Sequence, residues 1–323
     1  MPLVSPAPHD APAQAGRAPS PSAGHPRPST RHLVQRPVTP EEFFLGTTVR
    51  GEYRYVLSDT LPGAGHQPAE GHRNRIDGLG FVSDALYDVA RFVALRQLGL
   101  SRRTAPRVTE TSVDITEEGP WRPAGRRAYA VTDLVFRAPE RDRAGGPLEC
   151  TATVGVDGVP CATARARLDF PGPAPAGSSP ADFPGSARGP EPLAPHRVGR
   201  SDPRDVVLTG PVRAGHDRLT VGVAPRLGGP RRAGDAPLLA ASCQAAVLAA
   251  AELRGFSPAH CLPVHWSASL HRPPAPGVAL HCLAVPGAVE RDGRDRPVLK
   301  VRLSFAQDGS ALGSGCVTVV QDW

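Results

Sequence analysis

Apolar and polar positions alternate along much of the chain, which is the pattern of half-buried β-strands. Two stretches break this alternation and predict helices near 80–98 and 238–253. The first, GFVSDALYDVARFVALRQLGL, collects its apolar side chains on one face and its polar side chains on another. The second, PLLAASCQAAVLAAAEL, is apolar nearly all round, and Gln244 is its only strongly polar side chain between 238 and 251. We therefore expect the second helix to be enclosed on every side.

The same order of elements occurs twice. The blocks at about 34–170 and 196–323 each predict a strand, a Gly/Pro-rich loop, one helix and then several strands that close on a hairpin. Asp157-Gly158 and Asp308-Gly309 mark the two hairpin turns, because Asp-Gly is a strong two-residue turn signal. A curved antiparallel sheet has one apolar concave face, which a single helix can fill. The pattern therefore predicts an α+β fold of two repeats, each a curved antiparallel sheet wrapped around one central helix.

Two segments carry few side chains to bury. Residues 1–33 are rich in Pro, Ala, Ser and His, and residues 171–195 are rich in Pro, Gly and Ala. We interpret the first as a disordered N-terminal tail and the second as a linker. The predicted organisation is thus tail, repeat 34–170, linker and repeat 196–323.

Composition excludes several function classes. The net charge of +6 comes from scattered arginines mixed with acids, and Lys300 is the only lysine, so we expect no nucleic-acid-binding face. No run approaches the roughly 20 apolar residues of a membrane span. No secretory signal is apparent at the N-terminus. Six cysteines in 323 residues are too few for a disulfide scaffold, so we expect reduced thiols and a cytoplasmic location. A mildly basic surface would suit an acidic protein partner.

The first predicted helix carries a polar stripe. Asp84, Tyr87, Asp88 and Arg91 are spaced i, i+3, i+4 and i+7, which places them on one side of the helix. The stripe is either a solvated face with an Asp88–Arg91 ion pair or the polar side of a functional site, and the sequence leaves both interpretations open.

These features together resemble the A-factor biosynthesis hotdog family (AfsA-like proteins). RVGRSDPRDVVLTG, at 197–210, is similar to the family's Arg…Asp-Val-Val-Leu opening of the second repeat. GDAPLLAASCQAA, at 234–246, resembles the family's loop-to-helix segment, and LHRP, at 270–273, lies where the family has Phe-x-Arg. In the first block, FVSDALYDVARFVAL resembles the family's Val-x-Glu-x-x-Arg-Gln helix. The resemblance covers both blocks and implies a double hotdog fold.

The resemblance also implies an activity. Family members are thought to transfer a β-ketoacyl group from an acyl carrier protein to dihydroxyacetone phosphate, in the biosynthesis of γ-butyrolactone signals of secondary metabolism. By resemblance, the protein is then an acyltransferase whose partner is an acyl carrier protein or another acyl thioester. We expect no metal, no cofactor, and no nucleic-acid or membrane partner. Whether the chain forms a homodimer is left open by the sequence.

The family's functional positions transfer only in part. In the first helix the family's Glu falls on Asp84, its Arg on Tyr87 and its Gln on Asp88. In the second helix the Glu becomes alanine, the Arg becomes Cys243, and the Gln survives as Gln244. By resemblance, the candidate catalytic residues are Asp84 and Gln244, and the candidate substrate-binding residues are Tyr87, Asp88, Asp235, Cys243 and Arg272.

Acyl transfer from a thioester needs a base for the incoming hydroxyl and donors for the oxyanion. Asp84 lies in the first turns of its helix, where the helix dipole favours the ionised form that a base requires. Gln244 would orient the substrate, or it is a core amide bonded to the backbone. Two other functions remain open because most Glu and Arg positions are replaced. One is a hotdog dehydratase or thioesterase acting on carrier-bound acyl chains, and the other is a catalytically decayed double hotdog that binds an acyl ligand or a partner.

Overall fold

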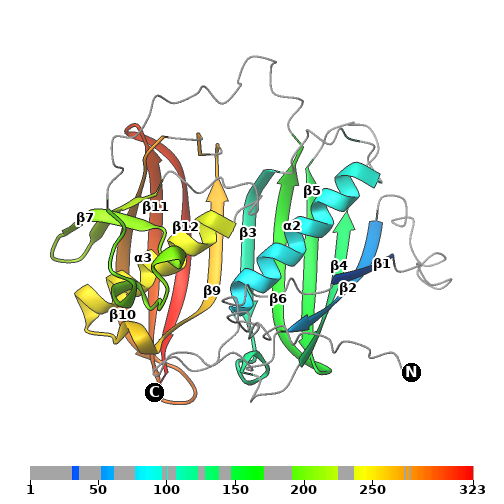
Figure 1. Ribbon diagram of the computed structural model, residues 1–323, viewed down its shortest axis with the longest axis horizontal. Helices are drawn as coiled ribbons and strands as arrows, with labels where there is room; N and C mark the ends of the chain where they lie inside the picture. Colours follow the sequence, from blue (N-terminus) through cyan, green and yellow to red (C-terminus); the bar gives the residue numbers. More distant parts are fainter. Residues whose placement is uncertain are drawn as a thin grey trace, which may run out of the picture.

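One extended antiparallel sheet forms the body of the protein, and two long helices lie on the same face of it (Figure 1). None of the helices in the described part of the chain is long and apolar enough to cross a membrane. The computed structural model describes residues 31–35, 52–61, 77–96, 100, 107–122, 128–137, 147–170, 191–224, 236–272, 274–275 and 278–322.

The elements fall into two successive groups. The first group is β1 (Arg31–Gln35), β2 (Glu52–Leu61), α2 (Gly78–Arg96), β3 (Arg107–Ile115), β4 (Ala128–Arg137), β5 (Leu148–Val156) and β6 (Val159–Asp169). The second group is β7 (Leu208–Ala214), β8 (Leu219–Val223), α3 (Ala236–Arg254), β9 (Cys261–Leu270), β10 (Leu280–Arg291), β11 (Pro297–Gln307) and β12 (Ser310–Gln321). Short 3-10 helices are η1 (Gly119–Trp121), η2 (Pro195–Val198), η3 (Pro203–Asp205) and η4 (Pro258–His260).

The strand order repeats across the sheet. Within the described residues the order is β1-β2-β4-β5-β6-β3-β9-β12-β11-β10-β8-β7. Read outward from the centre, the run β3-β6-β5-β4-β2 has the same succession as β9-β12-β11-β10-β8. The two halves therefore meet where β3 pairs with β9. On the sheet face that carries no helix, the His265 Nδ1 atom lies 2.5 Å from Asp114 Oδ1 across this joint.

The predicted tail and linker lie mostly outside the described residues. The last three residues of the predicted tail, 31–33, belong to β1. At the end of the predicted linker, Pro192 bridges to Thr209, and η2 begins at Pro195.

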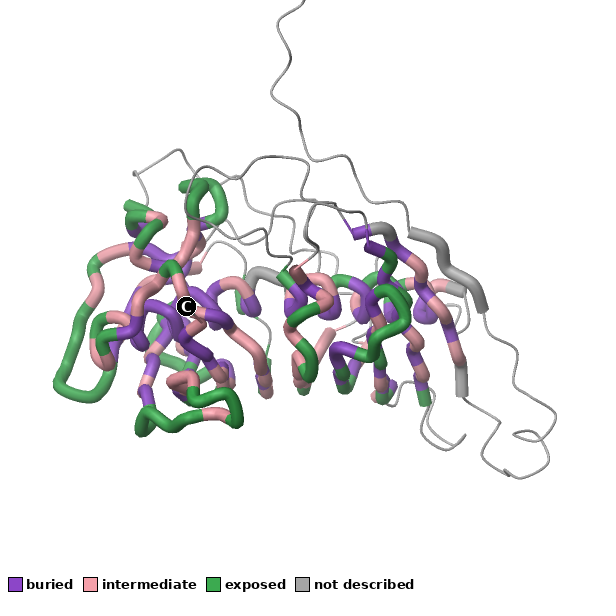
Figure 2. Tube along the Cα trace, turned by 90° about the horizontal axis from the view of Figure 1, so that it is seen from below, coloured by how far each residue is buried: buried purple, intermediate pink, exposed green. Residues whose placement is uncertain are grey.

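The two helices differ in what surrounds them. On α2 the apolar positions face the sheet, while Asp84, Asp88 and Arg91 remain exposed. Every side chain of α3 from 241 to 250 is buried, as its sequence predicts. Figure 2 shows that buried and more exposed positions alternate along the strands, as in β4. Gly255 ends α3 with a φ of 72°, a left-handed conformation that glycine adopts without strain.

An ionic cluster joins the halves at one end of the sheet. Glu118, beside η1, accepts hydrogen bonds from two guanidinium nitrogens of Arg296, which lies in the β10–β11 turn. Arg296 also contacts Asp292 and Asp322, and Arg122 pairs with both Glu118 and Asp322. The side chains are 11–31% exposed, so the charges of this cluster are largely removed from water.

Candidate functional site

A niche opens between α2 and strands β3 and β6. Its empty volume is about 290 Å³, part of which is open to solvent. Three residues with hydroxyl groups line it, Ser83 and Tyr87 of α2 and Thr111 of β3. The space inside it that a water-sized sphere can reach is only about 10 Å³, room for about one water molecule. Ligand pockets run from roughly 300 to 1,000 Å³, so an acyl chain can enter the niche only if the side chains of its wall move apart. Its apolar wall is made by Leu86, Val108, Ala166 and Leu168.

The start of α2 is fixed by local contacts. Asp77 precedes the helix, and its Oδ1 atom accepts a hydrogen bond of 3.0 Å from the Gly80 backbone N–H. Gly78 lies against an indole ring, because a Cβ atom there would approach Trp121 Cδ2 to 2.9 Å. The Phe81 ring contacts the same indole at a centroid distance of 5.7 Å. These contacts hold the turn of α2 that carries the niche residues.

The predicted polar stripe of α2 divides between solvent and the niche. Asp84, Asp88 and Arg91 are exposed, whereas Tyr87 is half-buried and lines the niche. Asp84 follows Ser83 directly and lies one turn before Tyr87, but it is not among the residues that line the niche. Its role as a base and the roles of Tyr87 and Asp88 stay predictions.

The side-chain amide of Gln244 forms hydrogen bonds with backbone groups. The residue is 1% exposed. Its Oε1 atom accepts a hydrogen bond of 3.0 Å from the Val207 N–H, and its Nε2 atom donates one of 2.6 Å to the Asp205 carbonyl. The amide therefore fastens α3 to the segment between η3 and β7. This is the geometry expected for the structural alternative, and a catalytic role for Gln244 stays a prediction.

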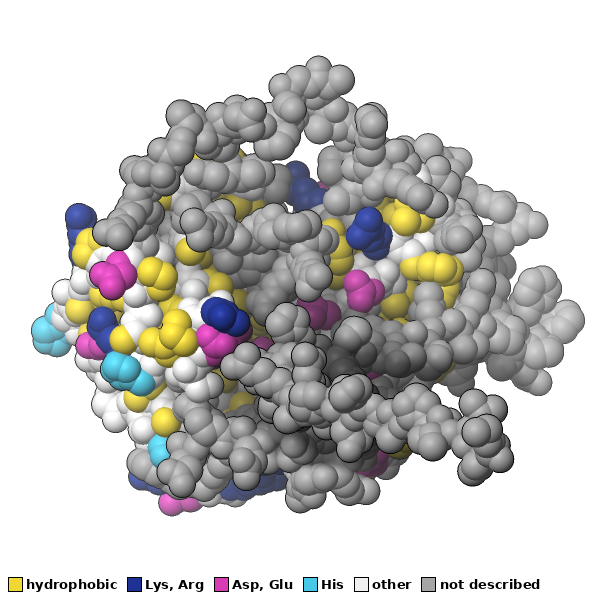
Figure 3. Space-filling view, viewed as in Figure 1, with side chains coloured by type: hydrophobic (Ala, Val, Ile, Leu, Met, Phe, Trp, Pro, Cys, Tyr) yellow, Lys and Arg dark blue, Asp and Glu magenta, His cyan; other side chains and the backbone are white. Residues whose placement is uncertain are grey.

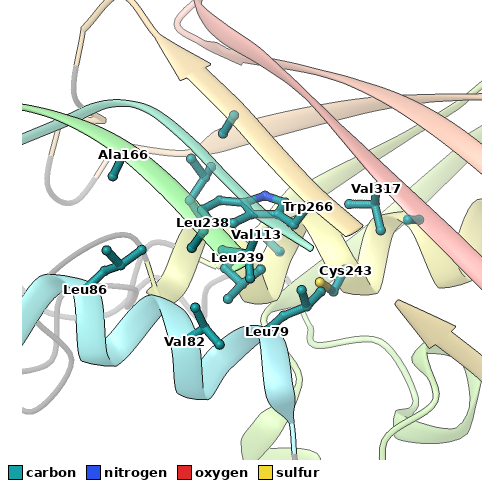
Figure 4. Packing of buried hydrophobic residues seen from close by; sticks show 14 of the residues in the cluster. Leu79, Val82, Leu86, Val113, Ala166, Leu238, Leu239, Cys243, Trp266 and Val317 are labelled. Atoms are coloured by element: carbon teal, nitrogen blue, oxygen red, sulfur yellow. The ribbon is translucent and has the colours of Figure 1, made fainter. Parts of the chain in front are cut away.

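Cys243 lies in the core next to the start of α2. Figure 4 shows its sulfur near Leu79, among side chains of both helices. Burial raises the pKa of the Cys243 thiol far above its usual range, nearby Asp77 raises it further, and Arg200 lowers it. Because the thiolate is the reactive form, this protonated thiol is a poor nucleophile at neutral pH. A contact between Cys243 and the substrate stays a prediction.

The remaining predicted residues are not brought to the niche by any described contact. Asp235 lies outside the described residues. Arg272 follows β9 and is exposed. Figure 3 shows that acidic and basic side chains on the helix-bearing face stand among hydrophobic ones in the described surface.

Sequence reasoning missed Ser83 and Thr111. Ser83 adjoins the polar stripe but is 9% exposed, because it turns toward the sheet. Thr111 lies in an alternating strand, RVTETSVDI, where it reads as an ordinary strand residue. Only the packing of α2 on β3 brings these two hydroxyl groups to one niche.

Comparisons with known proteins agree on the fold. No protein-family model matches the chain, and no curated protein sequence matches it at a significant level. Among solved structures, the chain is similar to a candidate thioesterase from Novosphingobium aromaticivorans, with a TM-score of 0.51 and 16% identity over 84% of this chain and 96% of that chain. It is also similar to the tesB protein of Mycobacterium avium subs paratuberculosis, with a TM-score of 0.50 and 12% identity over 81% of this chain and 92% of that chain.

A third structure carries the name of the fold. It is a conserved protein of unknown function with a hot dog fold from Alicyclobacillus acidocaldarius, matched with a TM-score of 0.50 and 15% identity over 83% of this chain and 93% of that chain. At such identities the likeness concerns the fold alone. The protein has a hotdog fold. The narrower resemblance to the A-factor biosynthesis family gains no support from these comparisons and stays a proposal.

Proposed function

We propose that the protein is a double hotdog that acts on acyl groups held as thioesters, as a thioesterase or dehydratase does. The repeated strand order, with one helix in each half of the sheet, supports the two-repeat interpretation. The repeats would span about 34–170 and 196–323, as the sequence predicts.

The niche beside α2 carries the proposal. An acyl thioester combines an apolar chain with a polar carbonyl, and the niche combines an apolar wall with three hydroxyl groups. In the proposed binding mode the chain enters the niche end first, and the scissile bond lies near Asp84, which directly follows Ser83 of the niche wall. Positioned hydroxyls can donate to a developing oxyanion, which is the largest electrostatic requirement of acyl chemistry.

For hydrolysis, Asp84 removes a proton from a water molecule, and the water oxygen attacks the thioester carbonyl carbon. The carbonyl oxygen becomes an oxyanion and accepts hydrogen bonds from Tyr87 and Thr111. As the carbonyl re-forms, the C–S bond breaks, and the leaving thiolate takes up the proton held by Asp84. The products are a carboxylic acid and a free thiol.

Transfer to dihydroxyacetone phosphate is the narrower version of the same chemistry. The acceptor hydroxyl then replaces water as the nucleophile, and its phosphate needs a cation nearby. Arg91, exposed on the same face of α2 as Asp84, is the residue that would bind this phosphate.

The test uses the purified chain and β-ketoacyl thioesters of an acyl carrier protein, with and without dihydroxyacetone phosphate. Mass spectrometry of the products distinguishes the candidate activities. A free acid indicates a thioesterase, and an ester of the acceptor indicates the transferase. A β-hydroxyacyl thioester supplied in parallel and converted to an enoyl thioester indicates a dehydratase. Bound but unchanged thioester indicates a decayed binding protein, and failure to bind any of these thioesters would reject the proposal.

A further inference from the structure

The turns and the shifts in strand-pairing register occur at matching places in the two halves, so they align the two sequences. The turn Asp157-Gly158 joins β5 to β6, and Asp308-Gly309 joins β11 to β12. In β5 the pairing register shifts between Val154 and Gly155, three residues before the turn. In β11 it shifts between Phe305 and Ala306, also three residues before the turn. Turn and bulge therefore match β5–β6 to β11–β12 residue by residue.

A second pair of bulges aligns the central strands. The pairing of β3 with β6 shifts between Val108 and Glu110. The pairing of β9 with β12 shifts between Pro263 and His265. Val108 of the first half thus corresponds to Pro263 of the second, and Glu110 corresponds to His265.

This register shows what the second half holds at the niche positions. Thr111, which pairs with Ala166 in the first half, corresponds to Trp266, which pairs with Val317 in the second. A threonine and an alanine are thereby matched by a tryptophan and a valine, and both larger side chains are fully buried. Figure 4 shows the Trp266 indole packed near Leu238 of α3. The space that forms a niche beside α2 is filled by protein beside α3.

The helix side is closed as well. Both helices have 19 residues, so matching their starts places Ser83 on Ala241 and Tyr87 on Ala245. Both alanines have an exposed fraction of 0%. The family motif instead places Ser83 on Leu239 and Tyr87 on Cys243, which are also buried and carry no hydroxyl group. The loop after η2 packs against η4 and α3, because a Cβ atom at Gly199 would lie 2.6 Å from the Pro258 carbonyl oxygen of η4 and 3.6 Å from Val247 Cγ1 of α3. At the positions that bring hydroxyls to the first niche, α3 therefore has methyl groups sealed from solvent.

From this alignment we infer that the chain carries a single acyl site, in its first half, and that Trp266 closes the equivalent site in the second half. The inference rests on the proposed function, because it assigns the number and place of the sites that bind the acyl group. Hydrogen bonding does not account for the tryptophan, since the Trp266 Nε1 atom has no partner among the described residues. The role of Trp266 at this position is instead to fill space with its indole ring.

The test counts ligands on the intact chain. The probe is 2-oxoheptyl-coenzyme A, in which a methylene between sulfur and carbonyl prevents hydrolysis, titrated by calorimetry. The wild-type chain should bind one probe molecule. Thr111→Trp copies the second-half residue into the first and should weaken binding at least about tenfold, since overfilling a packed space is unfavourable. Thr111→Val keeps the size and should retain measurable binding, and Trp266→Phe keeps the second half filled and should leave the count at one.

A photolabel gives a second measurement that needs no variant. The same probe with a diazirine at the acyl end should label peptides of α2, β3 or β6. Two ligands per chain, labelling of α3, β9 or β12, or a folded Thr111→Trp chain with unchanged affinity would overturn the inference and leave the proposed function standing. Absence of binding to the wild-type chain, together with no turnover of any thioester, would reject both.

Discussion

Glu118 accepts two hydrogen bonds from Arg296, at 2.7 and 2.8 Å, across the joint between the two halves of the sheet. The two side chains are only 11% and 15% exposed. The hydrogen bonds from the Arg296 side chain to Glu118 raise the pKa of the guanidinium, so Arg296 stays fully charged. The pair therefore ties residues far apart in the chain at a place where water cannot easily replace either partner.

Glu118→Gln should lower the free energy of unfolding by about 1–3 kcal/mol, because the guanidinium groups of Arg296 and Arg122 lose a charged partner in a place largely removed from water. Urea denaturation measures the loss. Glu117→Gln is the matched control, since Glu117 lies 3.8 Å from Arg294 with both side chains more than half exposed, and it should change stability by less than about 0.5 kcal/mol. Equal losses in the two variants would contradict the importance of the buried pair.

Gln244→Leu should also destabilise the protein by about 1–3 kcal/mol, because the Val207 N–H and the Asp205 carbonyl lose their partners. Thermal and urea unfolding provide the measurement. Ser242→Ala serves as the control on the same helix, since the Ser242 hydroxyl donates to the carbonyl of Leu238, one turn earlier within α3 itself. A Gln244→Leu chain as stable as wild type would indicate that the amide is not a structural fastener.

Asp84→Asn should reduce thioester turnover by about 10²–10⁴-fold, the usual contribution of a general base. Stability should change by less than about 0.5 kcal/mol, because the side chain is exposed. Initial rates on the thioester that the wild type converts, together with a melting curve, separate the two effects. Glu149→Gln, an exposed carboxylate on β5, is the control and should keep the wild-type rate. Full activity of Asp84→Asn would remove Asp84 from the mechanism.

Alkaline pH should destabilise the protein through its buried thiols. Burial raises the pKa of Cys282 from 9.0 to about 12, so the thiol stays protonated in the folded chain while the unfolded chain ionises above pH 9. The unfolded state then binds fewer protons, and the free energy of unfolding falls as pH rises from about 9 toward 12. One pH unit above the unfolded pKa costs about 1.4 kcal/mol per thiol.

Urea unfolding of wild type and Cys282→Ala at several alkaline pH values checks this. The variant starts less stable but should lose less stability as the pH rises. Parallel losses in the two chains would show that Cys282 is not responsible.

Much of the fold can be predicted from the sequence because its signals are local. The helices, predicted near 80–98 and 238–253, span Gly78–Arg96 and Ala236–Arg254. Both Asp-Gly turns join neighbouring strands, and the aspartates and glycines have positive φ angles of 49–82°, as a tight hairpin requires. The enclosure of α3 likewise follows from its uniformly apolar composition.

The candidate site was less predictable because its contacts are not local. Gln244 meets backbone groups nearly 40 residues earlier, and nothing in the helix sequence names that partner. The niche brings Ser83 of α2 to β6 residues such as Leu168, although three other strands separate β6 from α2 in the chain. Trp266 reads from sequence as a core aromatic residue, and its match to Thr111 emerges only from the pairing register of four strands.

The pairing of β3 with β9, from Glu110 opposite Ser269 to Asp114 opposite His265, gives the second half a part in covering the first. If that half were removed, β3 would become an open edge strand, with unpaired backbone groups able to recruit another chain. A half whose own site is filled still shields the strand that forms one wall of the other half's site. If Trp266 closes the second site, as inferred above, the site is lost while β3 stays paired, whereas deletion of the second half would expose the β3 edge.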